Sequence, residues 1–383
     1  MLHADICIAG AGIIGLSLAL ELERRGASVL VAEATTPLRQ ASTAAAGMLA
    51  AEDPENPLQL LPLSRLSRDL YPGFLAYIEA RSGLAVPFQT NITLQRYDEP
   101  HTTLQPPLPL LDEATRSLTQ QKLQRLLAPS ASNDDRFHLL AEHSIDPRQL
   151  APALLRAVQQ SPRIQLLENA PVQSTESLPS GVRITTPNAI IEARSFVDCT
   201  GAWANTCTQP DPTSPSSNPL IVPIKGQMLA LSIPDGVELD LTIRTPPLYI
   251  VPRLYGPAAG RVIIGATVED VGFDKIVHKA DIAALHQQAA SLIPALARAE
   301  VLESWAGLRP SSPDRLPFLG PHPTRPHHFL ATGHYRNGIL LAPATAHVLA
   351  DLLLNQSPTV DLSAFSCNRT LTPVPLATAS LTH

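Results

Sequence analysis

The pattern of apolar and polar positions near the start of the chain predicts a strand, a helix and a second strand in close succession. Residues 5–9 form a short apolar run, and the motif GAGIIG follows it directly. The next residues, LSLALELERRG, place leucine and alanine at helical spacing until Gly26 ends the pattern, and the apolar run SVLVAE then ends at Glu33. A unit of this order, about thirty residues long, is typical of a nucleotide-binding βαβ crossover.

The rest of the chain alternates between helical and strand patterns. Helical spacing is found at 63–82, 113–127, 148–158, 281–298 and 339–354. Pro343 is expected in the first turn of the last helix or at a kink within it. Apolar runs and half-buried alternation predict strands at 91–97, 163–172, 181–186, 189–200, 220–231, 249–254, 261–269 and 329–333. The strands between 220 and 269 suit an antiparallel sheet.

These patterns predict an α/β fold whose two domains are interleaved along the sequence. Pieces typical of a Rossmann-like nucleotide-binding domain stand at 1–82, 145–215 and 305–383. A substrate domain with a mixed or antiparallel sheet is expected at 83–144 and 216–304. The length of 383 residues agrees with two compact units better than with one.

Composition and charge narrow the class of ligand. Hydrophobic residues make up 44% of the chain and charged residues 16%, which excludes a disordered protein. The net charge is -6, and the chain has no dense Lys/Arg run. No surface for nucleic acid or an anionic membrane is therefore expected, and we expect a small-molecule ligand. Proline-rich stretches at 105–111 and 209–220 are expected to be loops or linkers.

Cysteine usage and the apolar runs indicate a cytoplasmic protein. The four cysteines show no CxxC spacing, which is typical of reduced thiols. The run 6–20 has the apolarity of a signal-peptide core, but Asp5 precedes it and three glycines interrupt it, and no other run reaches transmembrane length. The histidines nearest to one another, His322, His327 and His328, have no cysteine or carboxylate at ligand spacing, so no metal site is expected.

The glycine motif has the context that dinucleotide binding requires. The candidate residues are Gly10, Gly12, Ile13, Ile14 and Gly15, followed about twenty positions later by Glu33. Such glycines permit a tight turn, a close approach of backbone to pyrophosphate and helix–strand packing, while the helix N-terminus favours the phosphate charge. The glutamate is placed to accept hydrogen bonds from a ribose. An ordinary glycine-rich turn is the alternative, and the motif does not separate FAD from NAD.

A run of small residues, ASTAAAGM, follows this unit at 41–48. Small residues in series let a flat ring lie against backbone amides, although alone such a run is more often a packed helix. Its candidate residues are Ser42, Thr43, Ala46, Gly47 and Met48. Together with the opening and closing motifs, the run favours a ring-binding segment.

The opening unit, ASTAAAGML, VDCTGAWA, GLRPSSPDRLPFLG and ATGHYRNGILLAP together resemble the D-amino-acid oxidase superfamily of flavoproteins, and within it the glycine oxidases of thiamine biosynthesis. The similarity runs from about residue 5 to about residue 354, and the segment 98–134 matches no part of it. The resemblance implies FAD. Related sarcosine oxidases hold flavin covalently through a cysteine near the closing motifs, and this chain has none between Cys207 and Cys367, so non-covalent FAD is implied.

The resemblance also implies roles for individual residues. Gly10, Gly12, Gly15 and Glu33 would bind the ADP half, and the residues of 41–48 would lie along the isoalloxazine ring. The further cofactor contacts would be Val172, Thr200, Gly201, Trp203, His334, Arg336, Asn337, Gly338 and Ile339. If a strand ends at Thr332 and a helix begins after Asn337, the first free amides of that helix point at the flavin carbonyl O2.

The substrate residues implied are Arg309, Tyr249 and Arg336. A guanidinium that binds a carboxylate in bidentate fashion orients the α-carbon from which the flavin takes a hydride. Each residue has a plainer alternative: a surface ion pair for either arginine, and a half-buried sheet residue for the tyrosine. His334 is expected to be structural, and no general base is assigned.

The function implied is oxidation of glycine to the imine, with sarcosine and small D-amino acids as further candidates. Dioxygen would reoxidise the flavin and give hydrogen peroxide, and the imine would pass to a thiazole synthase. A dehydrogenase that delivers electrons to a quinone or a partner subunit is the first alternative. A flavin-binding protein without turnover, or an assembly chaperone, is the second. A homo-oligomer is expected from the relatives.

Overall fold

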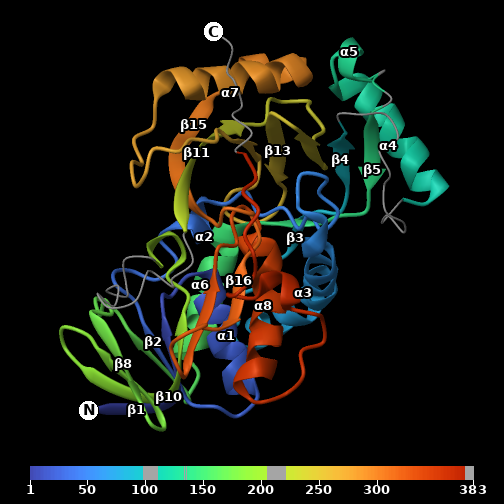
Figure 1. The fold of residues 1–383 in the computed structure, drawn as a ribbon. Coiled ribbons are helices and arrows are strands. Elements are labelled where there is room, and N and C mark those ends of the chain that lie inside the picture. The colour runs from blue at the N-terminus through green and yellow to red at the C-terminus, as the bar shows by residue number, and fades with distance from the viewer. Residues whose placement is uncertain (98–110, 133, 135, 205–220, 376–383) are drawn as a thin grey trace.

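The computed structural model describes residues 1–97, 111–132, 134, 136–204 and 221–375 and shows two sheet-based halves (Figure 1). In the view of Figure 1 the half with the parallel sheet lies below the half with the mixed sheet. The proline-rich stretches expected as loops fall almost entirely outside the described residues, as does Cys207.

The elements have these bounds. The helices are α1 Ile13–Arg24, α2 Ala41–Ala44, α3 Leu61–Ser82, α4 Glu113–Leu126, α5 Pro129–Ser132, α6 Pro147–Gln159, α7 Lys279–Leu292 and α8 Gly338–Leu353, with 3-10 turns η1 Leu58–Leu60, η2 Gly201–Trp203, η3 Pro294–Arg298 and η4 Ser363–Phe365. The strands are β1 Leu2–Ala9, β2 Val29–Ala32, β3 Phe88–Thr90, β4 Thr93–Arg96, β5 Phe137–Leu140, β6 Ser144–Ile145, β7 Ile164–Leu167, β8 Ser174–Leu178, β9 Gly181–Thr185, β10 Ile190–Asp198, β11 Val222–Ser232, β12 Thr242–Thr245, β13 Leu248–Arg253, β14 Arg261–Gly265, β15 Val301–Ser311, β16 Phe318–Pro321 and β17 His328–Thr332.

The lower sheet has the order β16-β17-β10-β1-β2-β7 and contains the predicted opening unit. Strands β1, β2, β7, β10 and β17 run parallel, while β16 pairs antiparallel with β17 and β8 and β9 form an antiparallel extension from β10. Side chains of β1 alternate between two cores, because Ile6 and Ile8 pack with the helices while Cys7 and Ala9 pack with β9 and β10. This half therefore has three layers: helices, parallel sheet and antiparallel extension.

Helix α8 contains a proline whose structural cost is offset by α3. Pro343 has no N–H to donate to the carbonyl of Ile339, and the hydroxyl of Tyr71 donates to that oxygen instead. One residue further on, Ser67 Oγ donates to the carbonyl of Leu340 at 2.6 Å and accepts from the amide of Ala344 at 3.1 Å. Pro343 thus lies inside α8 rather than in its first turn, and α3 supplies donors for the carbonyls of Ile339 and Leu340.

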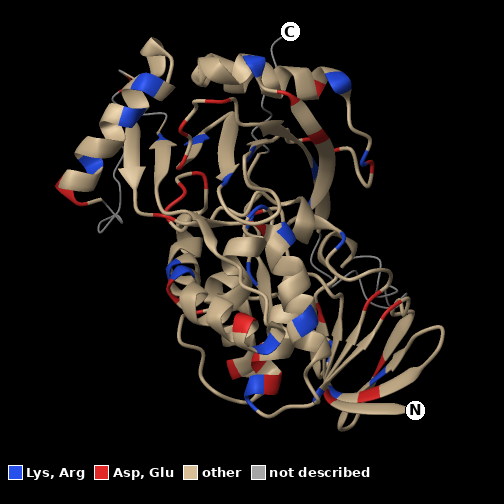
Figure 2. Cartoon of the chain, turned by 180° about the vertical axis from the view of Figure 1, so that it is seen from behind, with Lys and Arg blue, Asp and Glu red and all other residues tan. Residues whose placement is uncertain are grey.

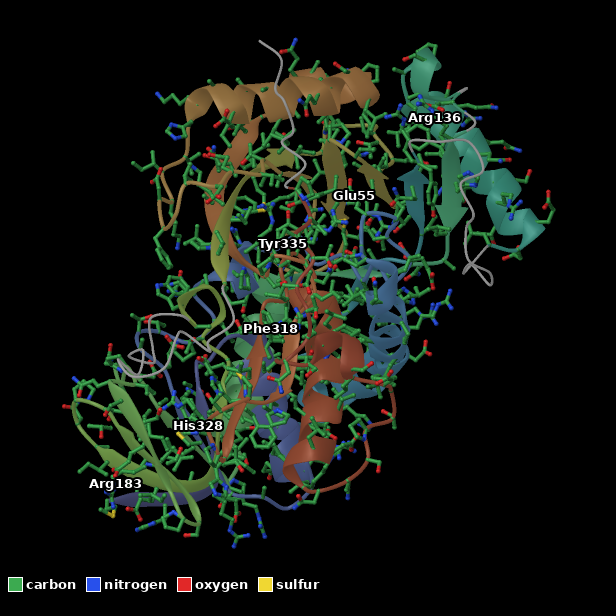
Figure 3. All side chains as sticks on the ribbon, viewed as in Figure 1. Glu55, Arg136, Arg183, Phe318, His328 and Tyr335 are labelled. Atoms are coloured by element: carbon green, nitrogen blue, oxygen red, sulfur yellow. The ribbon has the colours of Figure 1, made fainter. Side chains whose placement is uncertain are left out.

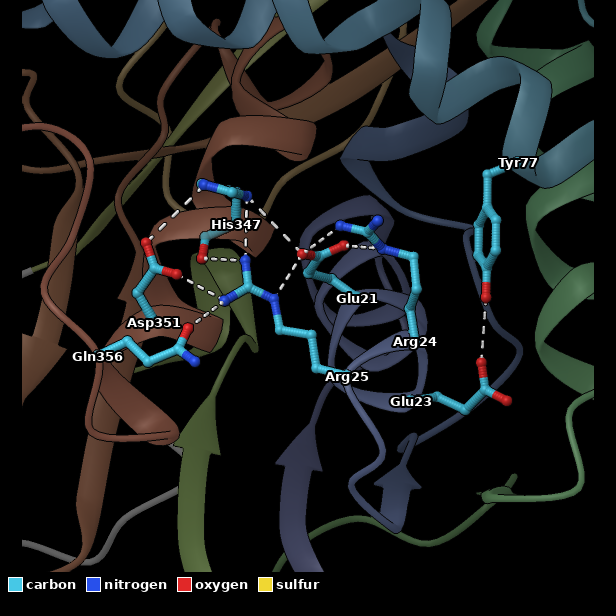
Figure 4. A network of polar contacts seen from close by, with 8 residues as sticks. All are labelled: Glu21, Glu23, Arg24, Arg25, Tyr77, His347, Asp351 and Gln356. Carbon is cyan, nitrogen blue, oxygen red and sulfur yellow. Dashed lines mark hydrogen bonds and ion pairs between the residues drawn. The ribbon is translucent and has the colours of Figure 1, made fainter.

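The far ends of α1 and α8 are joined by a polar network (Figure 4). Arg25 lies 2.5 Å from Asp351, 2.7 Å from Glu21 and 3.2 Å from the side-chain oxygen of Gln356. Its second Nη also donates to the carbonyl of His347. Burial would raise the pKa of Glu21, but bonds from Arg24 and Arg25 hold it below its ordinary value. The network fixes α8 beside α1, and both helices begin at the cavity described below.

The upper sheet has the order β15-β11-β14-β13-β12-β4-β5 and is antiparallel except for the β12–β4 pair. One face is covered by α7 and η3, which pack on apolar side chains of β11 to β14. The opposite face carries Ala230, Val251 and Ile263, which contact Ala46 and Met48 of the other half. A mixed sheet was predicted here, and the structure has one.

Several elements differ from the sequence-based expectations. The helix predicted at 281–298 is divided, because Pro294 forces Ile293 out of helical geometry and a 3-10 turn follows. Strands β3, β5, β6, β8, β12 and β16 were not predicted, and neither was β15. It pairs with β11 over its whole length and so crosses the domain boundary expected at residue 305. The interleaved domain division otherwise stays a prediction.

Charged residues are interspersed over both halves (Figure 2). Cys7, Cys199 and Cys367 are free thiols. Within the described ranges, no helix is both long and apolar enough to cross a bilayer, and no group of three His, Cys, Asp or Glu side chains is arranged to hold a metal.

Candidate active site

A cavity of about 1080 Å³ lies between the carboxyl ends of the parallel strands and the inner face of the mixed sheet. The residues that directly follow β1, β2 and β10 line one side, and residues of β11, β13, β14 and β15 line the other. Ligands of open parallel sheets bind at this carboxyl edge. The sequence candidates that line the cavity are Gly10, Gly12, Ile13, Ile14, Glu33, Ser42, Ala46, Gly47, Met48, Val172, Thr200, Gly201, Trp203, Tyr249, Arg309, His334, Arg336, Asn337, Gly338 and Ile339.

The glycine turn is made by close backbone packing. Gly10 has φ of 96°, and a Cβ there would lie 2.7 Å from the carbonyl oxygen of Cys199. A Cβ on Gly15 would lie 2.0 Å from the carbonyl oxygen of Gly10, so this residue fixes helix against strand without lining the cavity. No side chain caps α1 at Gly12, and no acidic residue stands in its first turn. The helix N-terminus can therefore accept a phosphate.

Glu33 stands at the cavity but already has backbone partners, one in the glycine turn and one in its own loop. Its two carboxylate oxygens accept from the amide of Ala11 at 2.7 Å and from the amide of Thr35 at 2.9 Å. The carboxylate is therefore oriented by backbone donors at the end of β2, where the sequence placed a ribose acceptor.

The 41–48 segment is helical only at Ala41–Ala44 and then becomes extended. Ser42 Oγ accepts from the amide of Ile13 at 2.9 Å. The hydroxyl of Thr43 donates back to the carbonyl of Leu38 at 2.9 Å, and Thr43 does not line the cavity. The alternative of a packed helix therefore applies only to Ala41–Ala44 and not to the rest of the segment.

The extended part of this segment is fixed at Gly47. Its φ is 83°, and a Cβ there would lie 2.1 Å from the carbonyl oxygen of Ile145. Its own carbonyl accepts from the amide of Ile145 at 2.9 Å, and Met48 makes an antiparallel bridge to Ser144. The chain from Ala45 to Met48 therefore presents small side chains and backbone to the cavity, as a flat ring requires.

Behind this segment, Thr200, Gly201 and Trp203 follow β10. Thr200 donates to Asp198 from its amide at 2.9 Å and from its hydroxyl at 2.5 Å, and Thr332 Oγ1 donates to the carbonyl of Gly201 at 3.0 Å. The ring of Trp203 lies 5.4 Å from that of Phe273, a residue of the other half. These bonds position the turn at the carboxyl edge of the sheet.

The closing segment forms the predicted strand, turn and helix. Strand β17 ends at Thr332 and α8 begins at Gly338, whose amide and that of Ile339 belong to the free first turn of the helix. His334 is buried and its Nε2 lies 3.1 Å from Thr345 Oγ1. Burial lowers the pKa of His334 to about 3, so the ring is neutral at physiological pH, in line with the structural role expected for it.

Arg309 and Tyr249 are brought together on the inner face of the mixed sheet. Nη1 of Arg309 donates to the carbonyls of Lys225 at 3.2 Å and Thr267 at 3.1 Å. Burial raises the pKa of Tyr249, and the charge of Arg309 opposes this only in part, so the phenol stays protonated. The pair can therefore offer a fixed guanidinium and a hydroxyl donor to one ligand.

Two glycines that the sequence reasoning missed make room for this pair. A Cβ on Gly226 would lie 2.2 Å from Nη2 of Arg309, and a Cβ on Gly265 would lie 2.2 Å from the hydroxyl of Tyr249. Both glycines stand inside strand patterns, where an isolated glycine indicates a bulge or a close approach. That signal is present in the sequence, but it does not show which side chain fills the space.

Arg336 lines the cavity, but its guanidinium is already paired. Nη2 lies 3.0 Å from Asp53 and Nη1 pairs with Glu55, and Asn337 donates to the side chain of Asn56 at 2.9 Å. Burial would lower the pKa of Arg336, but these two carboxylates raise it above its ordinary value. Figure 3 places the labelled Glu55 where the two halves meet. The sequence candidate is thus part of a polar contact between the 53–56 loop and the start of α8.

The cavity fits FAD. The glycine turn admits a pyrophosphate at the N-terminus of α1, whose N-cap residue Gly12 has no side chain and where Ser42 accepts from the amide of Ile13. The 45–48 segment presents mainly small residues to a flat ring, and the first turn of α8 supplies free amides at the far end. A dinucleotide that extends along the carboxyl edge of the parallel sheet meets all three.

Comparison with known proteins agrees with this geometry. The FAD dependent oxidoreductase (DAO) family pattern matches residues 5–352. A glycine oxidase of Geobacillus kaustophilus is 32% identical over 375 residues, which cover 95% of this chain and 97% of that protein. The crystal structure of glycine oxidase from that organism has a TM-score of 0.83 at 30% identity, covering 97% of this chain and 100% of that one.

A second group of relatives is longer than this chain. The bifunctional protein ThiO/ThiG of Synechocystis is 33% identical over 377 residues, and the match covers 96% of this chain but 54% of that protein. The chain thus spans about half the length of the bifunctional relatives and nearly all of the glycine oxidases. Because the family pattern matches residues 5–352, almost the entire chain, the chain belongs to the DAO family of FAD-dependent oxidoreductases.

Proposed function

We propose that the protein oxidises glycine to its imine with FAD and passes the electrons to dioxygen, giving hydrogen peroxide. The observation that carries the proposal is the placement of Arg309 and Tyr249 side by side over Gly226 and Gly265 on the cavity wall. The relatives named glycine oxidase support the choice of amino acid.

Arg309 binds the substrate carboxylate. Four other arginines are among the described residues that line the cavity. Arg336 is paired with Asp53 and Glu55, and Arg244 lies 2.9 Å from Glu142. Arg315 donates to the carbonyl of Pro375 and packs over the ring of Tyr335, and Arg39 is exposed. Arg309 instead is held at Nη1 by neutral carbonyls, which fix its position without cancelling its charge. It is therefore the guanidinium best placed to accept a carboxylate.

Tyr249 and the backbone complete the orientation of the substrate. The protonated phenol donates to the carboxylate beside Arg309, and these contacts direct the α-carbon toward the 45–48 segment. FAD, when bound, supplies the hydride acceptor. The first-turn amides of α8 place positive potential where the ring gains negative charge. We assign no general base, since an amine that binds deprotonated needs none.

The test is the visible spectrum of the purified holoenzyme, held anaerobic, after addition of glycine and then of sarcosine, D-alanine and D-proline. Rapid bleaching of the flavin band by glycine, with peroxide formed on admission of air, is the expected result. Bleaching without peroxide would favour the dehydrogenase. A flavin that no amine reduces would refute the glycine assignment and leave the family assignment intact.

Arg309→Ala tests the carboxylate contact directly. The substitution removes a charge-assisted bidentate bond, so the apparent KM for glycine should rise by roughly two to three orders of magnitude. Arg309→Lys, which keeps the charge but not the planar pair of donors, should recover part of the loss. An unchanged KM in the alanine variant would exclude Arg309 as the carboxylate ligand.

We further propose that the imine passes to a thiazole synthase and that the protein acts as a homo-oligomer. The bifunctional relatives join a second activity to the matched half in one chain, which supports a direct transfer. Light scattering of the purified protein decides the oligomeric state. The yield of thiazole should be unchanged by an added enzyme that consumes glyoxylate, the hydrolysis product of released imine, and a loss of yield would contradict direct transfer.

A further inference from the structure

Arg253 is a buried arginine that the proposed reaction does not use. It ends strand β13 on the same face as Tyr249 and is 3% exposed. Its Nη2 donates to the carbonyl of Ala46 at 2.8 Å, and its Nε lies 3.6 Å from Asp146. Within the part of the chain that the structure describes, its Nη1 has no hydrogen-bonding partner. A buried guanidinium with so few acceptors is costly to fold, so its position calls for a functional reason.

The carbonyl that it binds belongs to the 45–48 segment, which lines the cavity and would lie along the flavin ring. That segment is held from both halves: Trp305 of β15 donates to the carbonyl of Ala44 at 3.0 Å, and the amide of Ile145 donates to Gly47 at 2.9 Å. Arg253 supplies the third bond, between these two. The substrate sheet therefore fixes the backbone of the cofactor segment through two side chains, one on each side of Ala45.

Arg253 keeps its charge in this environment. Burial lowers its pKa to about 10, and the nearby Asp146 opposes the decrease. The group is therefore protonated at neutral pH. Asp146 also accepts from the amide of Arg148 at 2.9 Å as the N-cap of α6, so its negative charge is shared with a helix terminus. The guanidinium that binds the carbonyl of Ala46 is therefore positively charged.

We propose that Arg253 is a positioning residue of the cofactor site, which fixes the Ala46 carbonyl beneath the flavin ring and favours the reduced, more negative ring through its buried charge. The inference rests on FAD binding and not on the choice of glycine as substrate. It gives the substrate sheet a direct influence on the cofactor in addition to the substrate contacts of Arg309 and Tyr249.

The experiment compares Arg253→Met and Arg253→Lys with a control variant, Arg261→Gln. Arg261 is the residue of β14 that pairs with Arg253 of β13. Apoprotein of each is titrated with FAD, and the midpoint potential of each holoprotein is measured against a reference dye without any amine. The methionine keeps the volume but removes charge and donors, and FAD affinity should fall about 10- to 100-fold, as expected for loss of a buried charged hydrogen bond. Its potential should become more negative than that of the wild type.

The lysine variant separates the two parts of the proposal. A lysine retains the charge but not the geometry of the guanidinium, so the potential should stay near that of the wild type while FAD affinity decreases. The control should match the wild type in both measurements. The proposal would be overturned by an Arg253→Met variant with the wild-type midpoint potential, or by an Arg253→Lys variant with the wild-type affinity for FAD. If Arg253→Met does not fold, Arg253→Lys and Asp146→Asn decide the proposal. Removal of the Asp146 charge should make the potential more positive, and an unchanged potential would refute the electrostatic part.

Discussion

The two halves of the molecule build their parts of the site from different material. In the parallel half, the cavity wall is mainly backbone: glycine turns, helix N-termini and an extended run of small residues. In the mixed half, it is made by long side chains that lie over glycines of neighbouring strands, as Arg309 lies over Gly226. Each piece of the first kind is a short contiguous segment of the sequence. The second kind is assembled by the register of neighbouring strands. Substitutions in the parallel half should therefore impair FAD binding, and substitutions at these glycines and side chains of the mixed half should impair substrate binding.

The largest effect should come from the backbone-built half. A Cβ on Gly15 would lie 2.0 Å from the carbonyl oxygen of Gly10, and neither backbone segment can move without separating α1 from β1. Gly15→Ala should therefore abolish FAD binding and lower Tm strongly, as measured by the flavin absorbance of the purified protein and by calorimetry. Gly73→Ala, in α3 with open space around it, is the control and should stabilise by about 0.5–1 kcal/mol. A Gly15→Ala protein that retains bound flavin and is as stable as the wild type would contradict the proposed difference between the two halves.

Gly226→Ala should damage the mixed half while sparing the cofactor. The new methyl group would meet the guanidinium of Arg309 at 2.2–2.5 Å, and the flexible arginine would move away from its two carbonyls. We expect KM for glycine to rise roughly 10- to 100-fold, since about 1.4 kcal/mol corresponds to each factor of ten. FAD affinity should change little. A loss of FAD together with the rise in KM would show that the two halves are not separable in this way.

Acid should weaken the parallel half first. Burial lowers the pKa of His328 and His322 to about 4 and that of His334 to about 3, from 6.5. Below pH 6.5 the unfolded chain binds more protons than the folded protein at these histidines. The stabilising contribution of each neutral histidine is therefore complete above pH 6.5. The free energy of unfolding then falls by about 1.4 kcal/mol per pH unit for each of them, until the pH reaches the pKa of that histidine in the folded protein. Urea unfolding at pH 7.5, 6 and 5 measures the slope, and His328→Gln should reduce it.

The mixed half offers the matching control for acid. Hydrogen bonds from Arg136 hold the pKa of Asp134 below its ordinary 3.8, and Arg136 lies at the edge of this half (Figure 3). A depressed carboxylate pKa contributes stability that is lost only as pH falls below 3.8. Asp134→Asn should therefore leave the slope between pH 7.5 and 5 unchanged, and a flatter slope in this variant would contradict the assignment to the histidines.

The smallest effect is expected at an exposed ion pair between the halves. Arg148 of α6 lies 2.7 Å from Glu303 of β15, with side chains 41% and 38% exposed. Glu303→Gln should cost about 0.2–1 kcal/mol of unfolding free energy and less at high salt. Denaturant titrations at low and high ionic strength measure it. A cost above 2 kcal/mol would mean that this surface contact, rather than the buried bonds to Ala44 and Ala46, joins the halves.

The same contrast explains what the sequence could predict. The opening strand–helix–strand unit and the closing helix were predicted because their glycines, helical spacing and apolar runs are local signals. Strand β15 was missed: it is an edge strand in which Glu303, Trp305 and Gly307 break the alternation of apolar residues. The partners of Arg336 lie 281 residues away or more, and no local pattern indicates them.

The proline of α8 shows the same limit in a single helix. The sequence placed Pro343 in a helix but could not show that Tyr71 and Ser67 complete its hydrogen bonds, because those donors come from a helix more than 250 residues earlier. Local propensity therefore predicted the element, and tertiary contacts decided its form.

The position of the cavity between the first and the last helices also sets an order of events during synthesis. The N-terminus of α1 leaves the ribosome 325 residues before that of α8, from Ile13 to Gly338. At about 5–20 residues per second this interval lasts roughly 15 to 65 s. Until it has passed, the nascent chain offers a phosphate turn without the amides that complete the ring site. The complete cofactor site is therefore expected to form only after α8 has been synthesised.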